Sequence, residues 1–174
     1  GYERQNTLSS FRRALELEAD GLELDVFLSK DGHLFVFHDE VLEELTNAVG
    51  HPGRLTLKEL RELEIKPPEP YHGRHLPHSE ISIPSLVEVL ELIEEYKGKK
   101  PWINVELKGE GTEYEVPGVL KRYDRHNVLT LDRFLVSSFD HHNQLKRVKS
   151  LNPKLRLGVL YSGIFESLNE TFES

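Results

Sequence analysis

The alternation of short apolar runs with amphipathic helical stretches is the feature that most constrains how this chain can fold. Strand-like runs are predicted at residues 21–28, 33–37, 102–107, 133–137 and 155–160. A helical pattern at residues 7–18 precedes them, and others lie between them, at residues 116–125 and 140–149 and after residues 56 and 85. Strands that alternate with helices indicate parallel pairing through crossover connections. Two architectures fit, a (β/α) barrel and an open doubly wound sheet, and no glycine-rich phosphate loop follows a strand to favour the second.

Local signals predict where several of these elements begin. Two capping boxes, in which Ser or Thr is followed three residues later by Glu, open helices at Thr56-x-x-Glu59 and Ser85-x-x-Glu88. Pro117 is expected in the first turn of the helix at residues 116–125, where a missing N–H is tolerated. The His- and Pro-rich segment 65–82 is predicted to be a loop. Its part from Pro67 to Ser82 has two interpretations, a substrate-selecting cover over a site or a solvated connection.

The composition excludes several classes of protein. The chain has 174 residues, 37% of them hydrophobic and 30% charged, which is typical of one soluble domain with a full core. A formal net charge of −8 argues against a nucleic-acid partner, which would need a basic face. The absence of cysteine excludes disulfides, thiolate zinc sites and cysteine nucleophiles. No membrane span or signal peptide is visible, so we expect a cytoplasmic protein, and the start at Gly1 leaves open whether a targeting segment precedes it.

Polar side chains interrupt two of the predicted strands. Because side chains alternate along a strand, Glu23 and Asp25 share one face, and the apolar residues between them share the other. The later strand repeats this arrangement with Asn104, Glu106 and Lys108. A carboxylate in a buried parallel strand is costly unless it is paired or bound to metal. The alternative is that these are ordinary solvated or salt-bridged carboxylates.

His38 closes the strand-like run that follows Asp25. The intervening Asp31-Gly32 is a turn signal, and a two-residue hairpin there would place residues 25 and 38 opposite each other. A crossover to a parallel strand would instead place both residues at the carboxyl ends of their strands. Either topology brings His38 close to Asp25. The other histidines are interpreted as surface or core residues without a catalytic role: His33, His51, His72, His75, His78, His126, His141 and His142.

Three carboxylates without a thiolate form an oxygen-rich site that suits Mg²⁺ or Ca²⁺ better than zinc. A lysine beside them would be repelled by the cation and attracted to an anionic ligand. A dication, a lysine and a histidine together suit phosphoryl chemistry. The cation polarises phosphate oxygens, the lysine neutralises charge, and the histidine moves a proton.

The chain resembles the glycerophosphodiester phosphodiesterase family in segments spread over nearly its whole length. These segments are NTLSSFRRALE, ADGLELDVFLSKDGHLFVFHDEVLEELTN, LTLKELREL, IPSLVEVLELI, INVELK and VSSFD. The resemblance implies a (β/α)₈ TIM barrel with its site at the carboxyl ends of the strands. It also implies metal-dependent hydrolysis of a glycerophosphodiester, a small-molecule substrate, to sn-glycerol 3-phosphate and an alcohol. The implied roles are metal ligands Glu23, Asp25 and Glu106, an acid/base residue His38 and a phosphate contact Lys108.

The chain departs from the family pattern at both ends. Family members carry His-Arg-Gly on the first strand, whereas this chain opens with GYERQNTL, so that Gly1 corresponds to the glycine of the motif. We therefore expect residues 1–174 to form a single barrel domain that is incomplete in the chain as given, with the first strand and the last strands supplied by extensions. Two alternatives stay open, a related phospholipase D-like lyase that forms a cyclic phosphate and a non-catalytic phosphodiester-binding barrel.

Overall fold

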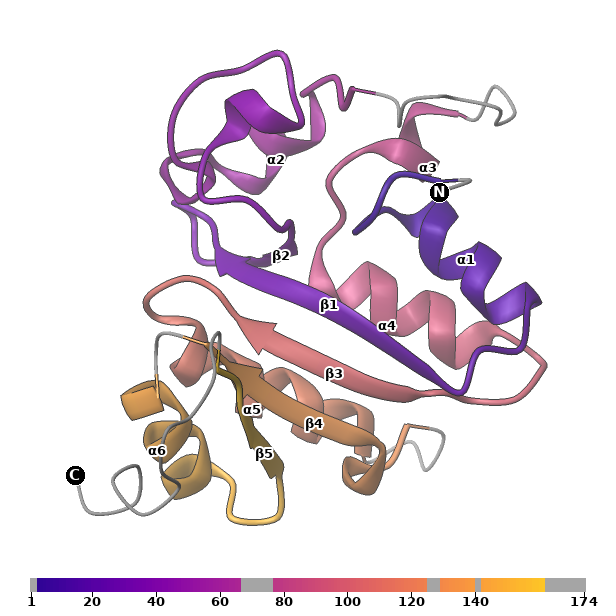
Figure 1. The fold of residues 1–174 in the computed structure, drawn as a ribbon, viewed down its shortest axis with the longest axis vertical. Coiled ribbons are helices and arrows are strands. Elements are labelled where there is room, and N and C mark those ends of the chain that lie inside the picture. The colour runs from indigo at the N-terminus through magenta and orange to yellow at the C-terminus, as the bar shows by residue number, and fades with distance from the viewer. Residues whose placement is uncertain (1–2, 67–76, 125–128, 140–141, 162–174) are drawn as a thin grey trace.

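A computed structural model describes residues 3–66, 77–124, 129–139 and 142–161. Within these residues five strands form one sheet in the order β2-β1-β3-β4-β5 (Figure 1). The strands are β1 (Gly21–Leu28), β2 (Leu34–Val36), β3 (Trp102–Leu107), β4 (Phe134–Ser138) and β5 (Arg156–Val159). All five predicted strands are present, and four of them, β1, β3, β4 and β5, pair in parallel as expected.

The strand β2 is the exception, because it pairs antiparallel to β1 at the edge of the sheet. Leu28 lies opposite Leu34, and Ser29 N–H donates to the carbonyl of His33 at 2.9 Å, which leaves a three-residue loop. Gly32 closes this loop with φ +80°, the left-handed conformation that a glycine adopts without a steric penalty. The two-residue loop considered from the sequence was therefore wrong, because the loop is one residue longer and the strand register shifts accordingly. The N–H of Phe37, not that of His38, donates to the Asp25 carbonyl at 3.0 Å.

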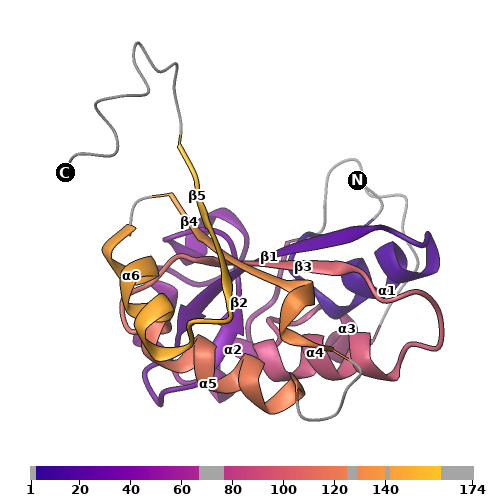
Figure 2. The ribbon, with the colours of Figure 1, turned by 90° about the horizontal axis from the view of Figure 1, so that it is seen from below.

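Helices cover one face of the sheet, as Figure 2 shows for α4 and α5. The main helices are α1 (Leu8–Glu16), α4 (Leu86–Glu95), α5 (Thr112–Asp124) and α6 (His142–Leu151), with shorter ones at α2 (Leu57–Arg61) and α3 (His78–Ile81). The apolar stripe predicted for α4 is fully buried and joins strand side chains in the main core: Leu86, Val89, Leu90 and Ile93 with Leu24, Val26, Val105 and Val136. Because these strand side chains are buried under α4, the residues that alternate with them on β1 and β3 point to the opposite face of the sheet.

Two helix starts were predicted correctly, whereas the start of α5 and the extent of one loop were not. Both capping boxes form, and the side chains of Thr56 and Ser85 accept the N–H of the third residue of their helices. The helix α5 begins one turn earlier than predicted, so Pro117 lies inside it rather than in its first turn. The predicted loop at 65–82 ends in the short helix α3, where Glu80 pairs with Arg12 of α1 at 3.1 Å. Residues 67–76 of that segment, and Asp140 at the start of the helix predicted at 140–149, lie outside the described residues.

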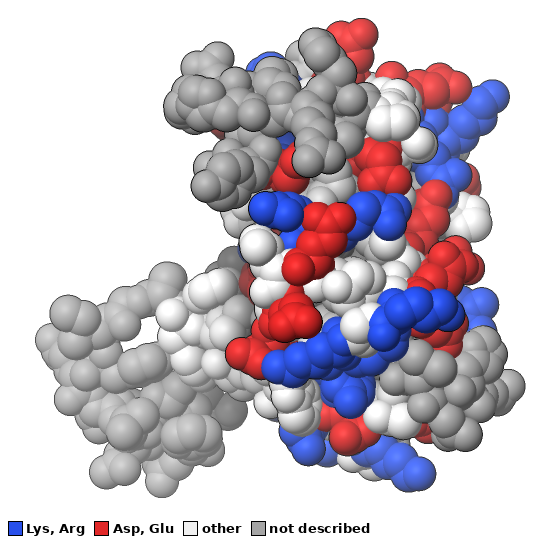
Figure 3. All heavy atoms as spheres, turned by 90° about the vertical axis from the view of Figure 1, so that its right-hand side faces the viewer, with Lys and Arg blue, Asp and Glu red and all other residues white. Residues whose placement is uncertain are grey.

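The side of the sheet where the parallel strands begin differs in its polar residues from the side where they end. Figure 3 views the side of the molecule where β1 and β3 begin, and acidic and basic side chains are interspersed over it. Residues next to these strand starts, Asp20 and Lys99, form an ion pair. The four parallel strands end on the opposite side of the sheet, and the polar side chains predicted to be functional lie towards these strand ends. None of the described helices is long and apolar enough to cross a membrane.

Candidate active site

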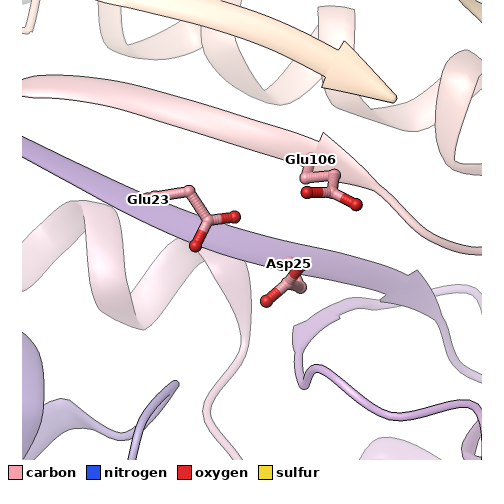
Figure 4. Close-up of side chains that lie close together, drawn as sticks. All are labelled: Glu23, Asp25 and Glu106. Carbon is pink, nitrogen blue, oxygen red and sulfur yellow. The ribbon is translucent and has the colours of Figure 1, made fainter. Parts of the chain in front are cut away.

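Three carboxylates converge on the sheet face that the helices leave uncovered. The parallel register of β1 and β3 places Asp25 beside Glu106, and Glu23 lies two residues earlier on the same face of β1. One oxygen from each of the three lies within 4.8 Å of the others. Figure 4 shows Glu23, Asp25 and Glu106 close together across the two strands. Asp25 and Glu106 are only 3% and 5% exposed, whereas Glu23 is open to solvent.

Lys108 follows directly after β3 and provides a positive charge beside the cluster. Its Nζ lies 2.7 Å from Glu106 Oε1 and 3.5 Å from Asp25 Oδ1. Its backbone N–H donates to the carbonyl of Val26 at 3.0 Å, which extends the pairing of β3 with β1 and fixes the lysine at the strand end. Burial alone would lower the pKa of Lys108, but Glu106 and Asp25 outweigh this effect and raise the pKa above its usual value. The ammonium group is therefore held in its charged form.

Asn6 is a member of the site that the sequence reasoning missed. Its Nδ2 donates to Asp25 Oδ2 at 2.8 Å and so connects the segment before α1 to the carboxylates. The backbone of Asn6 has φ 58°, in the left-handed region that Asn tolerates better than most residues. The helix cap is the next residue, Thr7, whose side chain accepts the N–H of Ser10. The sequence signal that could have indicated this role is the position of Asn6 at the start of NTLSSFRRALE, a segment that resembles the family.

The electrostatics of the cluster favour a bound cation. Partial burial raises the pKa of Glu23 to about 7, and the neighbouring charges of Asp25 and Glu106 add to this effect. Glu106 Oε1 is buried, and the Lys108 ammonium lies 2.7 Å from it. The donors are all carboxylate oxygens, which suits a hard divalent ion. The residues present therefore fit the metal site that the sequence predicted.

His38 lines a cavity that one of these carboxylates, Glu106, also lines. It follows β2 and lines a cavity of about 220 Å³ together with Glu106, Lys108 and Phe139. Its Nδ1 lies 2.5 Å from Asp39 Oδ1, and because an ionised carboxylate only accepts, we assign the proton to Nδ1 and leave Nε2 available. The His38 side chain is 47% exposed, and in its protonated form its charge would partly offset the rise in the pKa of Glu23.

Phe139 is a second site residue that was not predicted individually from the sequence. It follows β4 in the VSSFD segment, and its ring centroid lies 5.9 Å from Lys108 Nζ. This distance is within the range of a cation–π contact. The structure thus gathers all five residues singled out from the sequence, Glu23, Asp25, His38, Glu106 and Lys108, at one end of the sheet.

The fold and this carboxylate-rich site at the ends of parallel strands define an α/β protein with a candidate metal centre. The model of the glycerophosphoryl diester phosphodiesterase family matches residues 1–172. The chain belongs to this family. A glycerophosphodiester phosphodiesterase from Caldanaerobacter subterraneus subsp. tengcongensis is 39% identical over 165 residues, which cover 90% of this chain and 61% of that protein. A glycerophosphodiester phosphodiesterase from Bacillus altitudinis is also 39% identical, over 159 residues that cover 90% of this chain and 60% of that protein.

Solved structures agree with this assignment. A phosphodiesterase from Oleispira antarctica, in complex with the product sn-glycerol-3-phosphate, is 30% identical with a TM-score of 0.76, over 98% of this chain and 66% of that one. A putative glycerophosphodiester phosphodiesterase from Galdieria sulphuraria is 27% identical with a TM-score of 0.73, over 97% of this chain and 64% of that one. The predicted (β/α)₈ barrel class is confirmed, and the described residues form five strands of it. The chain spans about three fifths of the length of the two curated relatives.

Proposed function

We propose that the protein hydrolyses glycerophosphodiesters to sn-glycerol 3-phosphate and an alcohol in a reaction that depends on a divalent cation. The observation that carries this proposal is the meeting of three carboxylates with Lys108 beside a cavity that His38 lines. Family membership supports it, as does the product sn-glycerol-3-phosphate in the related Oleispira antarctica structure. Mg²⁺ and Ca²⁺ are the two candidate ions, because both prefer carboxylate oxygens.

In this proposal Glu23, Asp25 and Glu106 hold the cation. When bound, the cation would polarise the phosphate oxygens and stabilise the negative charge that develops on them. Asn6 holds the Asp25 carboxylate by the hydrogen bond to Oδ2, which leaves Oδ1 facing the cluster and Lys108. The fixed orientation matters because a ligand that needs no rearrangement binds a cation more tightly.

Lys108 and His38 act on the substrate itself. The ammonium of Lys108 neutralises part of the phosphate charge at the boundary between the carboxylates and the open cavity. His38 transfers a proton through Nε2, either from the attacking water or to the oxygen of the departing alcohol. Asp39 accepts from Nδ1–H and holds the ring in the tautomer that this transfer requires. The water oxygen bonds to phosphorus, the bond from phosphorus to the alcohol oxygen breaks, and the alcohol leaves with a proton.

The test is an assay of the intact protein with glycerophosphocholine, glycerophosphoethanolamine and glycerophosphoglycerol, with Mg²⁺, with Ca²⁺ and with a chelator. We expect sn-glycerol 3-phosphate to be released with a cation and release to stop with the chelator. A cyclic phosphate product would instead identify the lyase alternative. Binding without turnover would identify the non-catalytic alternative. The cytoplasmic location and the single-domain organisation remain predictions from the sequence.

A further inference from the structure

A second cavity adjoins the candidate active site and shares residues with it. It measures about 410 Å³, and both Lys108 and Glu40 line it as well as the cavity of His38. Its other walls include His51 and Arg54 from the connection after β2, and Glu110 from the loop after β3. We call it the Arg54 cavity. A phosphodiester carries two ester-linked groups, here called its glycerol arm and its alcohol arm. The two cavities meet at Lys108, the proposed phosphate-binding residue, and so offer one space for each arm.

His51 is held in a fixed orientation at the wall of the Arg54 cavity. Its Nδ1 accepts the backbone N–H of Gly53 at 3.0 Å, and its ring stands edge-on to Phe27 with centroids 5.7 Å apart. A nitrogen that accepts carries no proton, so the ring proton lies on Nε2 and His51 presents a donor. A side chain on Gly53 would come within 3.1 Å of His51 Cε1, so the glycine permits this close approach.

Three of the four charged groups that line the Arg54 cavity lack partners within the described part of the chain. The guanidinium of Arg54 makes no hydrogen bond or ion pair there, and neither do the carboxylates of Glu40 and Glu110. Lys108, by contrast, forms ion pairs with Asp25 and Glu106. A guanidinium prefers a planar anion such as a carboxylate, which it can bind through two parallel hydrogen bonds. The two glutamates prefer a cation or a donor.

The mixed charge of this cavity restricts the ligand. An arm with only a negative charge would be repelled by Glu40 and Glu110, and an arm with only a positive charge would be repelled by Arg54. An arm with both charges satisfies all three. We propose that the Arg54 cavity binds the alcohol arm of the diester and favours an alcohol that carries a carboxylate and an ammonium group, as serine does. This inference rests on the proposed phosphodiesterase function and adds the substrate class that the site selects.

The test measures kcat and KM of the intact protein on the serine, ethanolamine, choline and glycerol diesters of glycerol phosphate. Wild type should have its lowest KM for glycerophosphoserine. Arg54→Gln should raise that KM about threefold to tenfold more than the KM for glycerophosphoethanolamine, which lacks the carboxylate. His51→Asn keeps an acceptor for the Gly53 N–H but loses the Nε2 donor, and it should change the same ratio in the same direction. Glu110→Gln should raise KM for the serine and ethanolamine diesters relative to the KM for glycerophosphoglycerol.

Arg13→Gln is the matched control, because Arg13 is an exposed arginine on α1 that pairs with Glu16. Calorimetric titration of glycerophosphoserine into His38→Ala, with and without Arg54→Gln, gives a readout that does not need turnover. If wild type hydrolyses the diesters and Arg54→Gln leaves the KM ratio unchanged, the subsite is refuted and the proposed function stands. If no diester is hydrolysed but binding of glycerophosphoserine depends on Arg54, the function is refuted and the subsite stands. Absence of both effects refutes both.

Discussion

Asn6 Nδ2 donates a 2.8 Å hydrogen bond to Asp25 Oδ2 and so couples the segment before α1 to the carboxylate cluster on β1. Asp25 is 3% exposed, so water cannot easily replace this donor. A residue that orients a metal ligand in this way contributes to affinity without touching the metal. Asn6 is therefore a positioning residue in the proposed site.

Asn6→Gly tests this role. Glycine tolerates the left-handed backbone of position 6, so the variant removes the hydrogen bond without adding strain. We expect Mg²⁺ or Ca²⁺ affinity to fall about 10-fold, the lower end of what outer-shell partners contribute. Isothermal titration calorimetry measures the change. Asn6→Ala should lose the same affinity and more thermal stability, because alanine is strained at positive φ. Unchanged cation affinity in the glycine variant would remove Asn6 from the site.

Glu23→Gln tests the cation site itself. The substitution keeps the size of the side chain and removes one of the three negative charges that converge. Cation affinity should fall, while the fold should be kept because Glu23 is exposed and faces away from the apolar core. Calorimetry with Mg²⁺ and Ca²⁺ measures the loss, and Glu18→Gln, next to the start of β1 and exposed, is the matched control. Equal affinity in the Glu23 variant and wild type would refute the metal assignment.

The raised pKa of Glu23 predicts how pH affects stability and cation binding. The pKa of Glu23 is about 7 in the folded protein against 4.5 for an unperturbed glutamate, so the folded state binds more protons between these values. The contribution of Glu23 to stability is therefore present at low pH and is lost as pH rises through about 7. A cation needs the ionised carboxylate, so its binding should tighten over the same range and release a proton.

Thermal melts at a series of pH values, with and without the cation, measure both effects. The increase in Tm on adding Mg²⁺ or Ca²⁺ should be larger above pH 7 than near pH 5. Calorimetry in buffers of different ionisation enthalpy should detect proton release. Glu23→Gln should abolish most of this pH dependence, because the titrating group is absent. A cation-induced shift in Tm that is the same at both ends of the range would contradict the prediction.

His38→Ala tests proton transfer. The substitution should lower kcat by about 10²–10⁴-fold, the usual contribution of a positioned acid or base. Metal affinity should change little, because His38 is not among the three clustered carboxylates. His33→Ala is the matched control, since His33 is an exposed histidine in the loop before β2. Wild-type turnover in His38→Ala would leave His38 with a structural role.

The sequence predicted the central part of the site because two simple periodicities combine there. Alternation along a strand placed Glu23 and Asp25 on one face, and parallel pairing then placed Asp25 beside Glu106. The hairpin register depended on the conformation of Gly32, which residue identity alone does not fix. Asn6 was missed because its partner lies nineteen residues away, across a packing contact between a loop and a strand. No local pattern encodes such a contact.

Lys108→Met separates phosphate binding from structural pairing. Methionine keeps most of the length of lysine and removes the ammonium that lies 2.7 Å from Glu106 and 3.5 Å from Asp25. The variant should lose about 10²-fold in kcat/KM on glycerophosphodiesters, since a preorganised charge beside the phosphate is removed. It should also bind Mg²⁺ or Ca²⁺ more tightly than wild type, because a positive charge no longer opposes the cation. Calorimetry and steady-state kinetics on the intact protein measure the two effects.

The opposite signs of these effects distinguish the proposed role from a purely structural one. Without a cation, Lys108→Met should melt at a lower temperature, because Asp25 and Glu106 are buried and lose their counter-ion. At saturating Mg²⁺ or Ca²⁺ the cation replaces that counter-ion, so most of the Tm difference should disappear while the loss in kcat/KM remains. Lys121→Met, at an exposed position on α5, should match wild type in every measurement. Full recovery of turnover together with Tm at saturating cation would show that Lys108 serves only to balance the charge of Asp25 and Glu106.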